Sequence, residues 1–315
     1  YLFDAILLTV DLAIRGSLTS VSLLANQFDD ETIAMLLKLK EEKPMLLTLC
    51  GLKLDQTEAD FSWMRLGPAD TKLLAPEIAV HADLTKLDTR GSDISGEAAE
   101  GLAKAVLDSK SLLEFGEVPM KELRADELTT LKLNSKRLGP PEAHVLASLI
   151  AVTGSVTSVN VLSNRLDVES ADVLLKVKAD KPNLRTLCGL THEETELDLN
   201  GKELGPGDAK LLAREICVIG ELTECDLRNN HFGVEGWATI FSALRVSPNS
   251  KIAKWDLSDE CLGPAIAQPL AEYISVCGEL ASVWTPAHKP MANPYDWLPC
   301  ARLSPCAPVI ARSST

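Results

Sequence analysis

Short apolar segments with a period of two recur along the chain, and each is followed by residues with helical spacing. In the clearest copy Leu222, Cys225, Leu227 and Phe232 are apolar, and Asn230 lies between the last two. Alternation over so short a run predicts a strand that is buried on one face. Related segments occupy residues 18–28, 84–94, 128–138, 156–166, 197–204 and 252–262.

A helix is expected after these strands, because the spacing of the apolar residues changes there to three or four. In segment 204–220 the apolar positions 209, 212, 213 and 216 share one helical face. Lys210, Arg214 and Glu215 fall elsewhere on this helix and are predicted to face solvent. Helices are expected to begin at Gly-Pro pairs, since proline fits the first helical turn. These pairs occupy positions 67–68, 139–140, 205–206 and 263–264.

A longer repeat is superimposed on the short one. The segment KPMLLTLCGL at 43–52 returns as KPNLRTLCGL at 181–190, and LGPADTKLLAPEI at 66–78 returns as LGPGDAKLLAREI at 204–216. The offset is 138 residues in both cases, and about half of positions 17–80 are identical at that offset. The sequence therefore predicts a duplication in which residues 17–100 match residues 155–238.

Three segments depart from the strand–helix unit. Only about ten residues separate the strand at Leu49 from the next one at Ala59, and the same is true of Leu187 and Leu197. This is too short for a helix, and we expect these segments to alter the local curvature of a stack. Segment 111–127 is predicted to contribute one short strand and an irregular connection.

The repeated pattern L-x-x-L-x-L-x-x-N-x-L resembles the leucine-rich repeat family over residues 18–283. The full helix of most units is similar to the ribonuclease-inhibitor-like subclass, and the LGPxDxKLLAxEI segments resemble repeats of expanded families in unicellular algae. The resemblance implies an α/β fold, a right-handed solenoid or horseshoe of strand–helix repeats with a parallel sheet on its concave face. We expect one solenoid domain over residues 1–283 and a proline-rich segment over 284–315.

The two ends of the chain carry their own expectations. Six prolines after residue 284 exclude a helix there. This tail is expected either to be extended or disordered, or to fold back so that Trp284, Tyr295 and Trp297 cap the stack. At the other end, residues 7–12 resemble a truncated strand, as at the edge of a longer array.

Composition narrows the classes of function. Hydrophobic residues make up 46% of the 315 residues and aromatic residues 4%, which suits a core of small aliphatic layers. The formal net charge of −14 argues against binding nucleic acid, because phosphate contacts require a surplus of Lys and Arg. The eight cysteines include no close CxxC pair, and free buried cysteine is typical of reducing compartments. We therefore expect an intracellular, cytoplasmic protein without a membrane span.

The sequence contains no motif for catalysis or for cofactor binding. The five histidines show no metal-ligand spacing, and HExxH, GxSxG and GxxxxGK[ST] do not occur. The recurring LGP triplet is explained by the recurring helix start rather than by a phosphate loop. We therefore expect no metal, no cofactor and no enzymatic activity.

Charged residues occupy the outward positions of the predicted strands. Stacked strands bring equivalent carboxylates about 5 Å apart, so they repel unless cations or a basic ligand lie among them. The pattern is compatible with a solvated face and with a binding surface, and interleaved cations suit the recognition of a protein. The candidate partner-binding residues are Lys86, Asp88, Arg90, Lys132, Asn134, Asp198, Asn200, Glu224, Asp226, Arg228, Lys254 and Asp256.

The leading prediction is a non-enzymatic interaction module or scaffold that binds a protein partner on its concave strand face. It would act as a monomer or as a subunit of a hetero-complex. Ran-GTPase activators share this repeat subclass, so a GTPase-activating regulator is a rival hypothesis, although this chain lacks their strongly acidic C-terminal tail. Two further hypotheses are a sensing repeat of an intracellular receptor and a subunit of a large assembly that docks through its tail or its convex helices.

Overall fold

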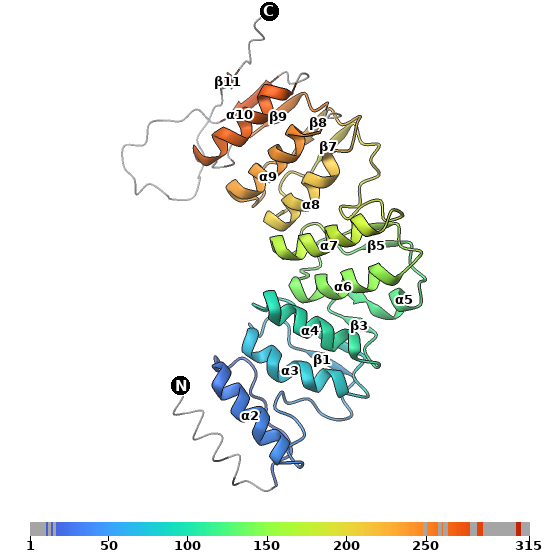
Figure 1. Ribbon diagram of the computed structural model, residues 1–315, viewed down its shortest axis with the longest axis vertical. Coiled ribbons are helices and arrows are strands. Elements are labelled where there is room, and N and C mark those ends of the chain that lie inside the picture. Colours follow the sequence, from blue (N-terminus) through green and yellow to red (C-terminus); the bar gives the residue numbers. More distant parts are fainter. Residues whose placement is uncertain are drawn as a thin grey trace, which may run out of the picture. The chain divides into compact units, whose positions relative to one another are not determined.

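The computed structural model describes residues 11, 14, 17–247, 251–257, 260, 264–277, 282–285 and 307–309, with the backbone alone at 254, 256, 282–285 and 307–309. The chain divides into two compact units. Unit 1 comprises Tyr1–Thr157 and Val173–Asn183, and unit 2 comprises Ser158–Asp172 and Leu184–Thr315. In each unit helices alternate with short strands (Figure 1).

Unit 1 contains a four-stranded sheet in the order β1-β2-β3-β4. Its first three strands are parallel, with Glu58 opposite Lys86 and Lys86 opposite Glu114, and β4 is antiparallel to β3. Helix α3 packs between α2 and α4, and α4 packs on α6 (Figure 1). The elements are α2 (Asp30–Glu42), β1 (Glu58–Asp60), α3 (Pro68–Val80), β2 (Lys86–Asp88), α4 (Gly96–Asp108), β3 (Glu114–Phe115), β4 (Val118–Pro119), α5 (Met120–Arg124), β5 (Thr130–Lys132) and α6 (Pro140–Val152).

Unit 2 contains a five-stranded sheet in the order β11-β10-β9-β8-β7, parallel except for the edge strand β11. Helix α9 packs between α8 and α10 (Figure 1). The elements are β6 (Ser158–Asn160), β7 (Glu196–Asp198), α8 (Pro206–Ile216), β8 (Glu224–Asp226), α9 (Gly233–Arg245), β9 (Lys254–Asp256), the 3₁₀ helix η1 (Pro264–Ile266), α10 (Ala267–Val276), β10 (Ser282–Thr285) and β11 (Ala307–Val309). Helix α7 (Val168–Asp180) begins among the residues of unit 2 and ends among those of unit 1.

The predicted α/β class is confirmed, with short parallel strands that alternate with helices. In strands β1, β2 and β5 to β9 the middle residue is buried, as expected for a strand with one face on the core. The buried middle residues are Ala59, Leu87, Leu131, Val159, Leu197, Cys225 and Trp255. The elements also recur with the sequence offset, since α7, β7 and β8 lie 138 residues after α2, β1 and β2.

Three Gly-Pro pairs begin α-helices as predicted, at α3, α6 and α8. In each helix a carboxylate of the first turn accepts a hydrogen bond of 2.8 Å from the N–H of the capping glycine. These carboxylates belong to Asp70, Glu142 and Asp208. At the fourth pair, Pro264 begins the 3₁₀ helix η1 that precedes α10, and Gly263 lies outside the described residues.

Segment 111–127 holds more regular structure than predicted. It forms the hairpin β3–β4 and the helix α5, so the expectation of one strand and an irregular connection was wrong. Gly116, with φ +58°, and Glu117 make the two-residue turn of the hairpin. Strands of two residues are too short to show a period in the sequence, which explains the error.

A buried carboxylate holds the segment before β7, which lacks a helix. Glu215 is 0% exposed; its Oε1 accepts from the N–H of Leu187 at 2.6 Å and its Oε2 from Oγ1 of Thr186 at 2.6 Å. Oγ1 of Thr186 accepts in turn from the N–H groups of Cys188 and Leu190, both at 3.0 Å. These two bonds occupy its lone pairs, so the hydroxyl proton must point at Glu215.

The same network occurs in unit 1. Glu77 accepts from the N–H of Leu49 at 2.7 Å and from Oγ1 of Thr48 at 2.6 Å, and it pairs with Lys40 at 2.5 Å. The prediction that Glu215 faces solvent was therefore wrong. Apolar spacing marks one helical face but does not distinguish a solvated charge from a carboxylate that binds buried backbone.

For every three-residue strand from β1 to β8, the third residue after the strand has a left-handed backbone conformation. The φ angles lie between 57° and 76°, a region that favours glycine and asparagine. The residues are Ala25, after the bridged segment that matches β6, and then Trp63, Gly91, Ser135, Ser163, Gly201 and Asn229. The same backbone conformation thus recurs at this position although the residue type changes. The apolar pattern of the sequence did not predict this conformation.

Aromatic side chains gather in the core of unit 2. Trp237 stacks on Phe241 with ring centroids 5.6 Å apart, and Trp255 meets Phe241 edge-on at 5.5 Å. Tyr273 stacks on Phe241 at 5.5 Å and accepts a hydrogen bond of 3.2 Å from Nε1 of Trp255. We expected a uniformly aliphatic core because aromatic residues are few. Composition does not show that several of these aromatic residues lie together in unit 2.

The expectations for the two ends fall largely outside the described residues. These include residues 7–10 and 12, Tyr295, Trp297 and the side chain of Trp284. Strand β10 continues the parallel sheet beyond β9, and β11 pairs with β10. Both predictions for the proline-rich tail stay predictions.

Replacing Glu215→Leu is expected to lower the free energy of unfolding of unit 2 by about 2–5 kcal/mol. The change leaves the N–H of Leu187 and the hydroxyl of Thr186 buried without an acceptor. Urea unfolding followed by near-ultraviolet circular dichroism reports on unit 2 through Trp237 and Trp255. The exposed Glu193→Gln is the control and should change little; a leucine variant as stable as the wild type would contradict the network.

Replacing Gly207→Ala is expected to destabilise unit 2 by about 1–3 kcal/mol through overpacking. A Cβ at Gly207 would overlap the carbonyl oxygen of Leu166 and lie 2.9 Å from that of Asp167. Gly101 in α4 has nothing within 4 Å of such a Cβ, so Gly101→Ala should stabilise its helix by about 0.5–1 kcal/mol. Thermal melts of the two variants should shift in opposite directions, and shifts in the same direction would refute the contrast.

Candidate functional site

The candidate site consists of the side chains that flank the buried middle residue of each strand. In unit 1 these belong to β1, β2, β3 and β5, and in unit 2 the described ones belong to β7 and β8. Because the strands are parallel and in register, equivalent side chains face neighbours on the next strand. Each unit therefore presents rows of charged side chains over an apolar floor.

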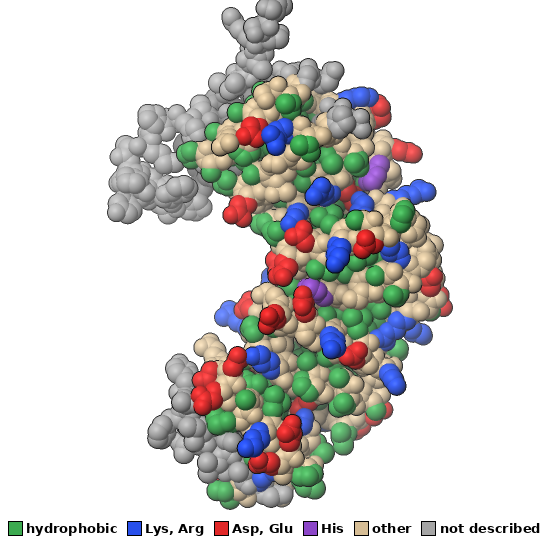
Figure 2. All heavy atoms as spheres, viewed as in Figure 1, with side chains coloured by type: hydrophobic (Ala, Val, Ile, Leu, Met, Phe, Trp, Pro, Cys, Tyr) green, Lys and Arg blue, Asp and Glu red, His purple; other side chains and the backbone are tan. Residues whose placement is uncertain are grey.

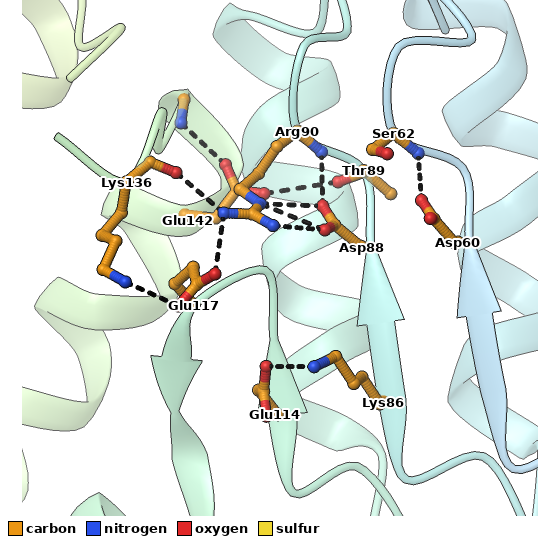
Figure 3. Close-up of polar contacts among 11 residues, drawn as sticks. Asp60, Ser62, Lys86, Asp88, Thr89, Arg90, Glu114, Glu117, Lys136 and Glu142 are labelled. Atoms are coloured by element: carbon orange, nitrogen blue, oxygen red, sulfur yellow. Dashed lines mark hydrogen bonds and ion pairs between the residues drawn. The ribbon is translucent and has the colours of Figure 1, made fainter.

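Arg90 and Asp88 form the centre of the rows in unit 1 (Figure 3). The guanidinium meets the carboxylate in a forked contact, with Nε 3.0 Å from Oδ1 and Nη2 2.6 Å from Oδ2. The N–H of Arg90 also donates to Oδ1 of Asp88 at 3.0 Å. These bonds raise the pKa of the Arg90 guanidinium, and the overlying Arg90 leaves Asp88 only 8% exposed.

The second edge of the Arg90 guanidinium reaches the next elements (Figure 3). Its Nη1 donates to Oε1 of Glu117 at 3.2 Å and to the carbonyl oxygen of Lys136 at 2.8 Å. Nζ of Lys136 lies 3.3 Å from Oε2 of Glu117. Arg90 thus joins the turns after β2, β3 and β5 into one alternating network of charges.

Lys86 and Asp60 lie on the same face with partners of their own (Figure 3). Lys86 pairs with Glu114 at 2.7 Å, and this hydrogen bond raises the pKa of the lysine. Hydrogen bonding by the Ser62 side chain, and then by the backbone N–H of Ser62 at 2.9 Å, lowers the pKa of the Asp60 carboxyl. Carboxylates and a cation therefore alternate along the row of Glu58, Lys86 and Glu114, whereas in the neighbouring row Asp60 lies opposite Asp88.

Glu142 lies beneath this network at the start of α6. It accepts from Gly139 N–H at 2.8 Å and lies 3.4 Å from Oγ1 of Thr89 (Figure 3). Burial raises the pKa of Glu142 to about 7. Asp208, at the equivalent place in α8, also has its pKa raised by burial to about 7.

Unit 2 repeats the forked pair at Asp226 and Arg228. Nε of Arg228 lies 3.0 Å from Oδ1 and Nη2 lies 2.7 Å from Oδ2 of Asp226. Asn200 donates to Oδ2 of Asp226 at 3.1 Å, and Asn229 donates to Oδ1 of Asn200 at 2.9 Å. The hydrogen bond from Arg228 is the main reason that the pKa of Asp226 falls to about 2.

The remaining predicted residues are less engaged. Asp198 is exposed and accepts from the N–H of Asn200 at 3.0 Å, and Glu224 is also exposed. Lys132 and Asn134, on and after β5, are exposed. The backbones of Lys254 and Asp256 form β9, and their side chains lie outside the described part of the chain.

The structure adds four residues that the sequence did not single out, namely Glu114, Glu117, Lys136 and Glu142. Glu114 and Glu117 lie in the segment whose hairpin was not predicted, and Glu142 was hidden by its role at a helix start. The two glutamates of the sequence EFGE, which could pair with Lys86 of β2 and with Arg90 after it, were the available signal.

The described surface gives little support to other chemistry. Burial raises the pKa of the thiols of Cys50 and Cys225, which disfavours the nucleophilic thiolate. Among the described residues no group of three or more His, Cys, Asp or Glu side chains is placed to hold a metal ion. None of the described helices has both the length and the apolar character of a bilayer span. Figure 2 shows Lys and Arg interspersed with Asp and Glu on the face in view.

Comparisons with known proteins give no family to which the chain can be assigned. No protein-family model matches the sequence, and no curated protein matches it. The repeats and the geometry of the strand face are therefore the basis for a functional proposal.

Replacing Glu142→Gln is expected to flatten the dependence of stability on pH. With a pKa near 7, the folded chain keeps a proton on Glu142 that the unfolded chain releases above about pH 4.5. The free energy of unfolding of the wild type should therefore fall as pH rises from 5 to 8, by about 1–3 kcal/mol for this group. Urea titrations across that range test this, with the exposed Glu97→Gln as control, and parallel profiles for wild type and Glu142→Gln would contradict it.

Proposed function

We propose that the chain is a leucine-rich repeat protein that binds a protein partner through its strand face. In this proposal its units belong to a right-handed, horseshoe-shaped solenoid of the ribonuclease-inhibitor-like subclass, with the parallel strands on the concave side. The recurrence of strand, left-handed turn and helix supports the architecture. The free cysteines support an intracellular location.

The observation that carries the binding proposal is that charged side chains on the strand face are held in fixed positions in the absence of a partner. Arg90 and Arg228 are each fixed to a carboxylate by a forked contact and by a backbone hydrogen bond. A side chain that is already ordered loses less conformational entropy on binding. Charges of both signs at fixed positions give specificity, because a partner must match the pattern.

A protein suits this face better than a small molecule does. The charged rows run across several strands in each unit, and their side chains stand on a floor of buried aliphatic residues. Small ligands are usually held in concave, largely apolar pockets. Extended rows of charged side chains match a second protein surface that carries the complementary pattern.

Exchanging charges at four strand positions, of which three are exposed and Lys86 is half-buried, is expected to weaken partner binding about tenfold or more. The variant combines Lys86→Glu, Lys132→Glu, Asp198→Lys and Glu224→Lys, which keeps the net charge unchanged. Asp226 and Arg228 stay as they are, because their mutual pair supports the face. Crosslinking mass spectrometry on cells that express each chain identifies the partners, and calorimetry with the purified partner gives the affinity.

The control exchanges two exposed charges on α4, Glu100→Lys and Lys104→Glu, which also keeps the net charge. This variant should retain every partner. If all crosslinked partners survive the strand-face exchange, or if the α4 exchange removes them instead, the proposed binding face is wrong.

A further inference from the structure

One aromatic side chain stands where the fold favours a small residue. Trp63 is the third residue after β1 and has φ +62°, and its counterpart 138 residues later is Gly201, with φ +64°. The other equivalents are alanine, glycine, serine or asparagine. A bulky residue in this region costs about 1–3 kcal/mol. Trp63 is 51% exposed, so burial offsets only part of that cost.

The exposed indole is nevertheless fixed in place. The backbone N–H of Trp63 donates to the carbonyl oxygen of Arg90 at 2.9 Å. The ring lies against Gly91, where a Cβ would come within 2.8 Å of Cε3. The guanidinium carbon of Arg137 lies over the ring, 5.0 Å from its centroid. Nη1 of Arg90 binds the carbonyl oxygen of Lys136, which ties the loop of Arg137 to that of Gly91 (Figure 3).

Trp63, Met64, Arg65 and Arg137 together form a surface that we name the Trp63 patch. All four residues are exposed, Met64 to 37%. Within the described part of the chain, neither Arg65 nor Arg137 forms an ion pair, in contrast to Arg90 and Lys86 beside them. The patch therefore combines apolar area with positive charge on a chain whose formal net charge is −14.

We propose that the Trp63 patch binds an acidic peptide segment of a partner protein. A carboxylate of the segment meets the free N–H groups of Arg137 and Arg65, and a neighbouring apolar side chain packs on the indole and on Met64. A guanidinium that already lies over an aromatic ring keeps its N–H edge available for a carboxylate. Trp and Arg are the residue types that most often dominate binding energy at protein interfaces.

A nucleic acid and a wholly apolar partner fit the patch less well than an acidic peptide does. A nucleic acid needs a row of cations along its phosphates, and the patch offers two on an acidic chain. An apolar partner would leave the charges of Arg65 and Arg137 without carboxylates. The patch lies in the turns after the strands, so its role goes beyond the proposed strand-face function and does not depend on it.

Selection of short random peptides displayed on phage tests the proposal with the whole chain as bait. The wild type should enrich peptides that carry Asp or Glu next to a bulky apolar residue, and Trp63→Gly should not. For a synthetic peptide of the enriched type, fluorescence polarisation should show affinity weakened about tenfold by Trp63→Gly and about fivefold by Arg137→Gln. Trp63→Phe should retain part of the affinity, and added salt should reduce it.

The internal duplication supplies the controls. Trp63→Gly should fold, since Gly201 adopts the same φ in the matching turn. A double variant with Trp63→Gly and Gly201→Trp keeps the composition but moves the indole to a turn where nothing lies within 4 Å of the new Cβ. It should not bind the peptide, and binding equal to wild type would show that any exposed tryptophan suffices, which overturns the proposal.

The remaining outcomes also decide the matter. A basic or wholly apolar consensus overturns the proposal, as does a single-stranded oligonucleotide that binds the wild type and not Trp63→Gly. The proposal is also overturned if the wild type binds no peptide but self-associates, and Trp63→Gly does not self-associate. The patch would then bind a second copy of the chain. The four-charge strand-face variant should keep its affinity for the peptide, so failure of the strand-face function and failure of this proposal are distinguishable.

Discussion

Backbone N–H groups that the short strands cannot pair are satisfied by buried carboxylates from the helices, and the fold depends on these bonds. Asp208, in the first turn of α8, accepts from its capping glycine and from Ser163 in the turn after β6. Glu215, in the last turn of α8, accepts from the Thr186–Leu187 segment, which has no helix of its own. Helix α3 makes the same bonds through Asp70 and Glu77. Desolvation opposes each buried carboxylate, and the hydrogen bonds that it accepts offset part of that cost while they satisfy the buried N–H groups.

These bonds account for the segments that are most alike in the two halves of the sequence. The motifs LGPxDxKLLAxEI and TLCGL supply the two sides of the same hydrogen bonds, the carboxylates from the first and the threonine and N–H groups from the second. The outward positions of the strands take no part in these hydrogen bonds, so their residue types can differ between the two halves. Lys86 in β2 corresponds to Glu224 in β8, so the two units share the Asp–Arg fork but carry opposite charges beside it. A shared scaffold thus presents two different charge patterns.

Periodicity was sufficient to predict strands β1, β2 and β5 to β9, the helices that start at Gly-Pro pairs and the buried middle residues such as Leu87 and Cys225. It did not reveal the left-handed turn position, because backbone torsion leaves no consistent residue type when Ala25, Trp63 and Gly91 all adopt it. It placed Glu215 in solvent, because a buried carboxylate is recognised only through partners that come from another segment. Of the candidate site, the Asp88–Arg90 and Asp226–Arg228 pairs follow from local sequence, whereas Glu114, Glu117 and Lys136 join them only through the unpredicted hairpin.

Helices α3 and α8 have similar sequences, so during folding one could pack in the place of the other. Such misassembly between repeats is a characteristic failure of repeat proteins. The glycine at position 207 bears on this misassembly. Helix α3 carries Ala69 at the matching position, and its methyl group would overlap the carbonyl oxygen of Leu166 if α3 took the place of α8. The absence of a side chain at Gly207 therefore fits α8 to its own place and disfavours α3 there.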